Sequence, residues 1–225
     1  MKKIPKLAAI AVAVLIFLPV AANACWVSIT ATNATGSETL TFTDQTLSGG
    51  FEGVAILDGF IKDLKLSGKA DPEIGAEFGV RAGSSATTFS ITSGLETFAA
   101  LTNPTAYASA GVSLTDRAPA GATITGLYAG GKMNQAMYNG TTAWANLVST
   151  FSVTGNTLTN DESQGTPGSP IVINDTLTSI ESNFYFTLSA RDSASGTSDF
   201  TVIPEPATIA LLGLGVLAML RKRRA

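Results

Sequence analysis

Short runs in which apolar and polar residues alternate recur through the middle of the chain, and this period of two constrains its fold most strongly. Alternation of this kind is typical of half-buried β-strands, whereas no long stretch shows the 3.6-residue apolar period of a helix. The alternating runs are WVSITAT, TLTFT, AEFGVRA, TTFSIT, ASAGVSLTD, STFSVTG and NFYFTLSAR. Each run predicts a strand with one apolar face and one Thr- and Ser-rich face.

Turn-forming residues separate these runs, because Gly supplies positive φ and Pro presets φ at corners. The turns are SGG at 48–50, SGKADPE at 67–73, AGSS at 82–85, TNPT at 102–105, APAG at 118–121 and QGTPGSP at 164–170. Many short strands with regular turns predict an all-β fold, an antiparallel β-sandwich of the jelly-roll-like kind. Residues 25–203 would form this domain, and they are numerous enough to bury a core of useful size.

Three segments leave their structure open at this stage. Residues 95–101 fit one or two helical turns and a strand equally well. In residues 133–147 the Met and Tyr spacing allows a short helix, but Asn139-Gly140 favours a hairpin turn between two strands. The polar stretch 155–170 is predicted to be a mobile loop.

The first 24 residues have the pattern of a secretory signal peptide. Three lysines precede an apolar run over Leu7–Leu18, and Ala22 and Ala24 supply the small residues that a signal peptidase needs. Cleavage is predicted after Ala24; the alternative is an uncleaved N-terminal anchor. Cys25 then begins the mature chain, and lipidation there is disfavoured because Ala22 stands where lipoproteins carry a leucine-like residue. Because the chain has 1 Cys, no internal disulfide can form.

The charge of the central domain excludes one class of partner. Residues 25–203 hold 7 basic and 16 acidic residues, a net charge of −9 that the whole-chain value of −3 conceals. Nucleic acid is bound chiefly through Lys and Arg on phosphates, so no nucleic-acid partner is expected. Attraction to divalent cations or to cationic polymers is compatible with this charge but unspecific.

Catalytic and cofactor motifs are missing from the sequence. The chain has 0 His, which excludes Ser-His-Asp and Cys-His catalysis and imidazole metal sites. Gly-x-Ser-x-Gly, the Walker A loop and Gly-x-Gly-x-x-Gly do not occur. We therefore assign no catalytic residue and no cofactor, and expect a protein that is not an enzyme.

Two weaker possibilities rest on acidic residues. Glycosidases use two carboxylates across a cleft, and the acids that could pair are Asp58 with Asp63, Asp71 with Glu73 and Glu77, and Asp161 with Glu162. Solvated acids on loops and strand faces are the preferred interpretation of all of them. A structural calcium ion held by oxygens of Asn160, Asp161 and Glu162 is the second possibility, without an EF-hand pattern to support it.

The last 22 residues contain three unlike pieces in a fixed order. Pro204-Glu205-Pro206 is followed by the apolar run Ala207–Leu220 and by the basic residues Arg221, Lys222, Arg223 and Arg224. As a helix the apolar run would be about 21 Å long, short of the roughly 30 Å of a bilayer core. It is therefore a marginal transmembrane helix, with the basic cluster as a cytoplasmic stop-transfer signal.

In this order and position, the three pieces closely resemble the PEP-CTERM sorting signal of exported proteins of Gram-negative bacteria. The resemblance covers residues 204–225 and implies processing by exosortase, a membrane-embedded transpeptidase-like enzyme, near the Pro-Glu-Pro triplet. It further implies transient membrane anchoring, delivery to the cell surface and a setting of exopolysaccharide and biofilm. An ordinary C-terminal anchor is the alternative.

Two functions for residues 25–203 follow. The first is a structural or adhesive protein of the extracellular matrix, associated with exopolysaccharide. The second is a carbohydrate-binding or carbohydrate-active module, since the β-sandwich is a common scaffold for both. Exposed aromatic residues on one concave face would favour the second function, and the candidates are Trp144, Tyr138, Tyr128 and Tyr107.

Overall fold

The computed structural model describes residues 26–42, 53–69 and 72–204, and the whole of this part is built from strands and turns. The strands are β1 (Val27–Asn33), β2 (Gly36–Phe42), β3 (Val54–Ile56), β4 (Gly59–Lys69), β5 (Glu73–Arg81), β6 (Thr87–Ser93), β7 (Glu96–Thr102), β8 (Thr105–Thr115), β9 (Ala122–Gly126), β10 (Lys132–Tyr138), β11 (Thr142–Ser149), β12 (Phe151–Val153), β13 (Thr157–Gln164), β14 (Ile171–Val172), β15 (Thr176–Leu188) and β16 (Ser193–Ile203). Within these ranges no helix has the length and apolarity to cross a membrane.

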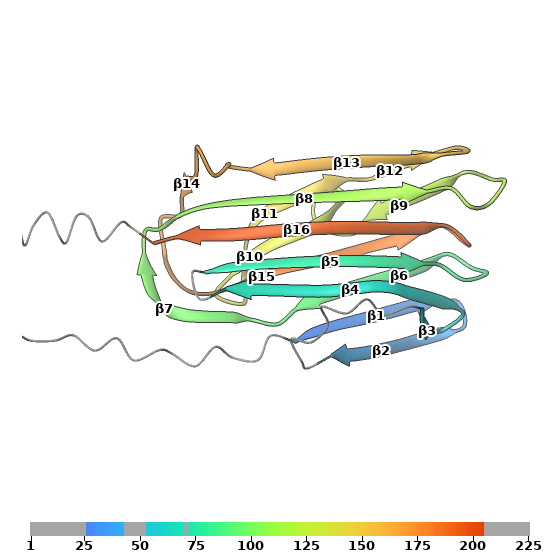
Figure 1. Ribbon diagram of the computed structural model, residues 1–225, viewed down its shortest axis with the longest axis horizontal. Helices are drawn as coiled ribbons and strands as arrows, with labels where there is room; N and C mark the ends of the chain where they lie inside the picture. The colour runs from blue at the N-terminus through green and yellow to red at the C-terminus, as the bar shows by residue number, and fades with distance from the viewer. Residues whose placement is uncertain (1–25, 43–52, 70–71, 205–225) are drawn as a thin grey trace, which may run out of the picture.

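The strands form two antiparallel sheets that pack face to face (Figure 1), which confirms the predicted antiparallel β-sandwich. Sheet A has the order β11-β10-β15-β6-β1-β2, with β7, β9 and β12 attached beside it. Sheet B has the order β13-β8-β16-β5-β4-β3, with β14 paired to β8. The predicted signal peptide, Cys25 and the run Ala207–Leu220 lie outside the described residues.

Two consecutive strands, β15 and β16, occupy the centres of the two sheets. On one side β15 pairs with β7 and then with β6, and on the other with β10 and then with β9. β16 pairs along its length with β5 and β8. Between them the buried Asp192 carboxylate accepts hydrogen bonds from the Arg117 backbone N–H (2.8 Å) and the Ser189 hydroxyl (2.5 Å). These bonds hold the turn where the chain crosses from one sheet to the other.

Aromatic side chains from both sheets fill the centre of the core. The ring of Phe78 on β5 meets Phe184 edge-on at 4.8 Å and stacks on Phe186 at 5.4 Å, and both partners come from β15. Phe89 on β6 extends the cluster, 5.8 Å from Phe186. Gly196 on β16 makes room for Phe78, because a Cβ there would lie 2.6 Å from its ring. Aromatic packing of this kind stabilises a sandwich that has no internal disulfide.

The alternating runs fall in strands as predicted, with their apolar members turned inward. In β6, for example, Phe89 and Ile91 are buried while Ser90 between them is not. Residues 96–102 form strand β7 and not helical turns. The hairpin prediction is also confirmed, because Asn139 (φ 53°) and Gly140 (φ 69°) join β10 to β11 with the two positive φ angles of a type I′ turn.

The prediction of a mobile loop over residues 155–170 is wrong. Residues Thr157–Gln164 form strand β13, which pairs with β8 along its whole length. Nearly all of its side chains are polar, so hydrophobic periodicity carries no strand signal there. Backbone pairing and hydroxyl contacts hold the strand instead, such as Ser113 to Thr159 at 2.7 Å and Thr115 to Thr157 at 2.9 Å.

The aromatic core can be tested with two neighbouring residues of β15. Phe186→Ala should lower the free energy of unfolding by about 3–5 kcal/mol, because it leaves a cavity between both sheets. The adjacent Tyr185 is 37% exposed on the opposite face, so Tyr185→Ala should cost no more than about 1 kcal/mol. Urea unfolding measures both values. Equal losses for the two variants would show that the cluster around Phe78 does not carry the core.

Candidate functional site

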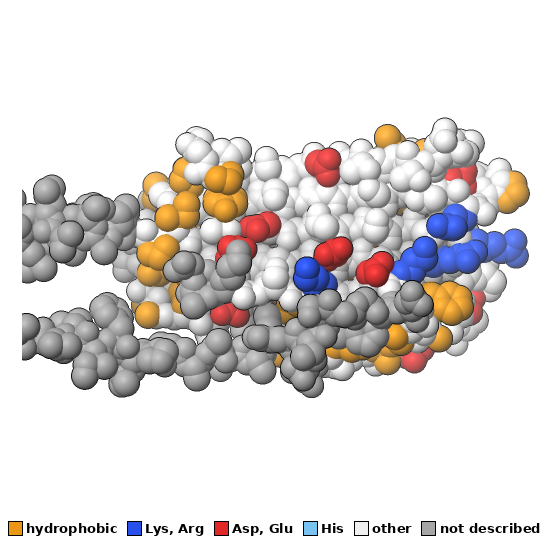
Figure 2. Space-filling view, viewed as in Figure 1, with side chains coloured by type: hydrophobic (Ala, Val, Ile, Leu, Met, Phe, Trp, Pro, Cys, Tyr) orange, Lys and Arg blue, Asp and Glu red, His pale blue; other side chains and the backbone are white. Residues whose placement is uncertain are grey.

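The outer face of sheet B is a flat polar surface built from five neighbouring strands. Because successive side chains of a strand point to opposite faces, the residues between the buried positions of β8, β16 and β5 all point outward here. In the middle of the face the outward residues are Thr157, Thr159, Asp161 and Ser163 on β13, Ser109, Gly111, Ser113 and Thr115 on β8, Ser195, Thr197 and Asp199 on β16, Gly75, Glu77 and Gly79 on β5, and Asp63, Lys65 and Ser67 on β4. Hydroxyl and carboxylate groups therefore dominate the face, as the mostly white surface with scattered red in Figure 2 shows.

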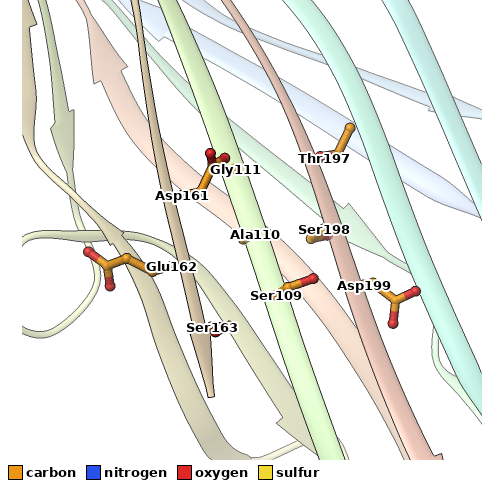
Figure 3. Close-up of a pocket in the computed structure, with 9 residues that line it drawn as sticks. All are labelled: Ser109, Ala110, Gly111, Asp161, Glu162, Ser163, Thr197, Ser198 and Asp199. Atoms are coloured by element: carbon orange, nitrogen blue, oxygen red, sulfur yellow. The ribbon is translucent and has the colours of Figure 1, made fainter. Parts of the chain in front are cut away.

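Two adjoining hollows cross the middle of this face, and we call them together the sheet B groove. One has a volume of about 440 Å³ and the other about 330 Å³, and both are lined by Gly111, Asp161 and Thr197. Ser109 and Asp199 line the first hollow, and Figure 3 shows them beside Thr197 and Asp161 on three neighbouring strands. The groove is open and polar, which suits a hydroxyl-rich ligand better than an apolar one.

Two glycines leave room for carboxylates of neighbouring strands: Gly111, which lines the groove, and Gly79 on β5. A Cβ at Gly111 would lie 2.1 Å from a carboxylate oxygen of Asp161. A Cβ at Gly79 would lie 3.0 Å from one of Asp63. Both carboxylates therefore lie flat over the neighbouring strand, a placement that a larger residue at Gly111 would prevent.

Asp161 and Glu77, two acids of this face, lie on strands that are three positions apart in sheet B. Asp161 is in register with Gly111, Thr197 and Glu77 on successive strands. At about 4.8 Å per strand, the backbones of Asp161 and Glu77 are roughly 14 Å apart. Glycosidases place their two carboxyl groups about 5–9.5 Å apart, and the backbones of Asp161 and Glu77 are farther apart than that.

The pair Asp58 and Asp63 is separated by the start of β4. Asp58 lies in the turn before β4 and accepts hydrogen bonds from the Ser84 hydroxyl and backbone N–H (both 2.7 Å) and from the Asn33 amide (2.8 Å). The bonds from Ser84 hold the pKa of Asp58 below its usual range. Asp58 is thus a structural turn residue, and Asp63 belongs to the outer face. Asp71 lies outside the described residues.

Asp161 and Glu162 point to opposite sides of β13, as Figure 3 shows, so the structure separates the proposed calcium ligands. Glu162 forms an ion pair with Lys132 (2.5 Å) and accepts bonds from the Ser149 N–H (2.9 Å) and hydroxyl (2.7 Å). Burial raises the pKa of Glu162, but the bonds from Lys132 and Ser149 outweigh it and hold the pKa below its usual range. Among the described residues, no three Asp, Glu, Cys or His side chains are grouped closely enough to share a metal ion.

The inward side of β13 closes one edge of the sandwich. Besides Glu162, Asn160 donates to the Ser149 carbonyl (3.2 Å) and Gln164 donates to the Trp144 carbonyl (2.9 Å). Alternate side chains of β13 thereby satisfy backbone groups on the edge strand β11 of the other sheet. Three backbone groups at the edge of sheet A are satisfied in this way, and the polar residues of β13 acquire a structural role that the sequence did not reveal.

The aromatic candidates do not form a binding platform. Trp144 stacks on Phe200 of sheet B at 5.3 Å, and Tyr138 is buried at 9% exposure. Tyr128 packs edge-on against Tyr185, and burial raises its pKa to about 12. Tyr107 is half-buried on the outer face of sheet B, outside the groove. The four side chains therefore share no face.

One residue of the predicted sorting motif is described. Pro204 is exposed and directly follows Ile203, the last residue of β16. Ala22, Ala24, Glu205, Pro206 and the basic cluster Arg221, Lys222, Arg223 and Arg224 lie outside the described residues.

Comparison with protein families finds the PEP-CTERM protein-sorting motif at residues 202–224. This match confirms the resemblance and marks the chain as an exported protein that is anchored in a membrane before exosortase processes it. The motif begins inside β16, two residues before Pro204. It covers the C-terminal segment of the chain.

Comparisons over the whole chain add no function. No curated protein matches it in sequence. Matching solved structures include those of infectious bursal disease virus Gt strain and Gx strain, at 11% and 10% identity and TM-scores of 0.24 and 0.21. They cover 81% and 83% of this chain, which spans 60% and 66% of theirs, less than two thirds in both cases. Likeness this slight carries no argument about fold or function.

The role of Glu162 in closing the edge can be tested by its pH dependence. Glu162→Gln should lower the free energy of unfolding at pH 7 by about 0.5–1 kcal/mol, as for a partly exposed ion pair. Because the folded pKa lies below the unfolded value of 4.5, this advantage of the wild type is present above pH 4.5 and lost as the pH falls through the folded pKa. Urea unfolding at pH 7, 5 and 3 measures the difference.

A double-mutant cycle supplies the control for this prediction. In a Lys132→Met background the Glu162→Gln change should cost less, because the ion pair is already removed. An advantage of Glu162 that is the same at pH 3 and pH 7 would contradict the assignment.

Proposed function

We propose that the β-sandwich is a non-catalytic structural or adhesive module that exosortase delivers to the cell surface, where it associates with exopolysaccharide. The observation that carries this proposal is the PEP-CTERM motif at residues 202–224, which continues the central strand of sheet B without a linker. The β-sandwich is therefore the part of the chain that the sorting motif would deliver. Its outer face on sheet B contributes hydroxyl and carboxylate groups that can form hydrogen bonds with a polysaccharide.

Two features of the domain are suited to a protein that is exported from the cell. It is held by a large aromatic core and by edge closure through β13, and neither depends on redox conditions. With 7 basic and 16 acidic residues in 25–203, it also carries enough net charge to resist self-association. A protein with these properties can persist within a hydrated polysaccharide matrix.

A second candidate function, carbohydrate binding, is favoured by the sheet B groove. Its hydroxyl and carboxylate groups can accept and donate hydrogen bonds to sugar hydroxyls along several saccharide units. Because the groove contains no aromatic platform for stacking, such binding would be weak and polar. Asp161, Thr197 and Asp199 are the residues that would make these contacts.

The sorting function is tested with cells that produce Pro204→Ala/Pro206→Ala in place of the wild type. We expect wild-type protein in the matrix fraction to lack residues 1–24 and the segment after the triplet by mass spectrometry. The variant should keep its tail, stay in the membrane fraction and reduce biofilm mass to the level of a deletion strain. Pro119→Ala, in the exposed turn at 118–121, is the matched control and should behave as wild type.

Three outcomes would overturn the proposal. A wild-type protein that keeps its tail in the matrix fraction would make the motif a plain anchor. A deletion strain with unchanged biofilm would remove the structural role, and polysaccharide hydrolysis by the purified protein would replace it with an enzymatic one.

The carbohydrate alternative needs variants in the groove, because Trp144→Ala would damage the core. In pull-downs with exopolysaccharide, Asp161→Ala/Thr197→Val should reduce retention several-fold, since a carboxylate and a hydroxyl that form hydrogen bonds are both lost. Thr41→Val, on the exposed surface of edge strand β2, should not. Retention that is equal in both variants would exclude the groove as the binding surface.

A further inference from the structure

The end of the sandwich from which the sorting motif leaves carries exposed aliphatic side chains. We call this end the proximal pole: it contains the end of β16 at Ile203, the start of β8 at Thr105, and β14. Val172 pairs with Thr105, and Thr105 pairs with Ile203, so these residues lie on three adjacent strands. Val172 is 50% exposed and Ile171 is 43% exposed. Figure 2 shows hydrophobic side chains gathered at this end.

The opposite end of the sandwich, the distal pole, carries a cluster of basic side chains beside the exposed Phe60, which pairs with Arg81. Its turns carry Arg117 and Arg191, and Arg81 lies at the end of β5 beside them, with its Nε donating to the Arg191 carbonyl (3.2 Å). Figure 2 shows Lys and Arg side chains gathered there. The two ends are about 30 Å apart along β8, whose 11 residues run from one to the other. Basic side chains therefore gather at the distal pole, whereas exposed aliphatic side chains gather at the proximal pole.

The distance from the proximal pole to the apolar run is very short. Ile203 is held in sheet B, and the adjacent Val202 N–H donates to the Pro72 carbonyl (2.8 Å). Residues 204–206 separate this fixed point from Ala207, the first residue of the apolar run. Three extended residues span at most about 10 Å. When the apolar run lies in a bilayer, the proximal pole therefore cannot move far from the lipid surface.

We propose that the proximal pole is a membrane-contact surface, on which Ile171 and Val172 rest against the outer leaflet while the tail is uncleaved. This inference rests on the membrane-anchored stage of the proposed function and names the surface that meets the lipid. The transfer of aliphatic side chains from water to the apolar part of a bilayer surface lowers the free energy.

Two aliphatic side chains alone would bind a bilayer only weakly. The membrane-anchored tail holds them close to the lipid and so raises their effective concentration at its surface. The acidic domain is not drawn to anionic lipid, so contact ends when exosortase removes the tail. The surface then becomes free at the same step that releases the protein.

Tryptophan reporters test the orientation directly. The chain, with its tail intact, is reconstituted into phosphatidylethanolamine–phosphatidylglycerol vesicles whose acyl chains carry bromine, a quencher of tryptophan emission. Trp26→Phe removes the exposed tryptophan, and Trp144 stays in the core as a constant background. Val172→Trp then reports from the proximal pole. Leu158→Trp is the matched control, because Leu158 is 44% exposed and in register with Leu114 near the distal end of β8.

We expect brominated lipid to reduce the reporter emission at position 172 at least two-fold more than at position 158. Ile171→Trp should repeat the result if the first reporter disturbs the fold. Insertion of a 20-residue Gly-Ser spacer between Ile203 and Pro204, roughly 25 Å in mean length, should bring the quenching at 172 down to the level at 158.

Equal quenching at positions 172 and 158 in the tethered chain would overturn the proposal. Flotation of the chain with the vesicles separates this failure from a failure of its premise. A chain that floats without quenching at 172 refutes the contact surface alone. A chain that does not float refutes membrane anchoring by the tail, and the contact surface with it.

Discussion

The whole sandwich depends on the placement of β15 and β16 at the centres of their sheets. These two strands are consecutive, so the last 28 residues before Pro204, from Thr176 to Ile203, provide the middle of both layers. Strands β6 and β10 of sheet A, and β5 and β8 of sheet B, meet only through them. The contacts are therefore mostly long-range in sequence, which is typical of folds that form slowly. Neither sheet is complete until the segment next to the sorting motif has been incorporated.

The centre of the sandwich is held by apolar contacts, whereas one of its edges is held by polar side chains. The centre is held by aromatic rings from β5, β6 and β15, whereas the edge between β11 and β13 is held by Asn160, Glu162 and Gln164. The same strand, β13, sends Asp161 to the outer face. One polar strand thus closes the sandwich on one side and shapes the sheet B groove on the other. This double use explains why Leu158 is the one apolar residue of the strand.

The functional surfaces follow from the position of the chain in space. The groove lies on a face that is parallel to the long axis, and the proximal pole lies at the end where the tail leaves. A protein held by its tail would keep the groove open to the surroundings while the pole faces lipid. As proposed, sorting, ligand contact and lipid contact use different parts of the molecule, so removal of the tail would leave the sheet B groove unchanged.

Residue order by itself determined the fold class and the address. Alternation in runs such as TTFSIT placed Phe89 and Ile91 inside, Asn139-Gly140 identified a hairpin, and the tail matched its family, because all three are local patterns. Only the tertiary structure decided that the polar segment β13 is a strand and that Asp161 and Glu162 point to opposite sides of it. It also decided that Trp144 packs in the core and that Val172 and Ile203 both flank Thr105 of β8. Each of these features depends on which strands become neighbours in a sheet. Strands that pair are often far apart in the chain, so a local sequence pattern cannot predict which of them will pair.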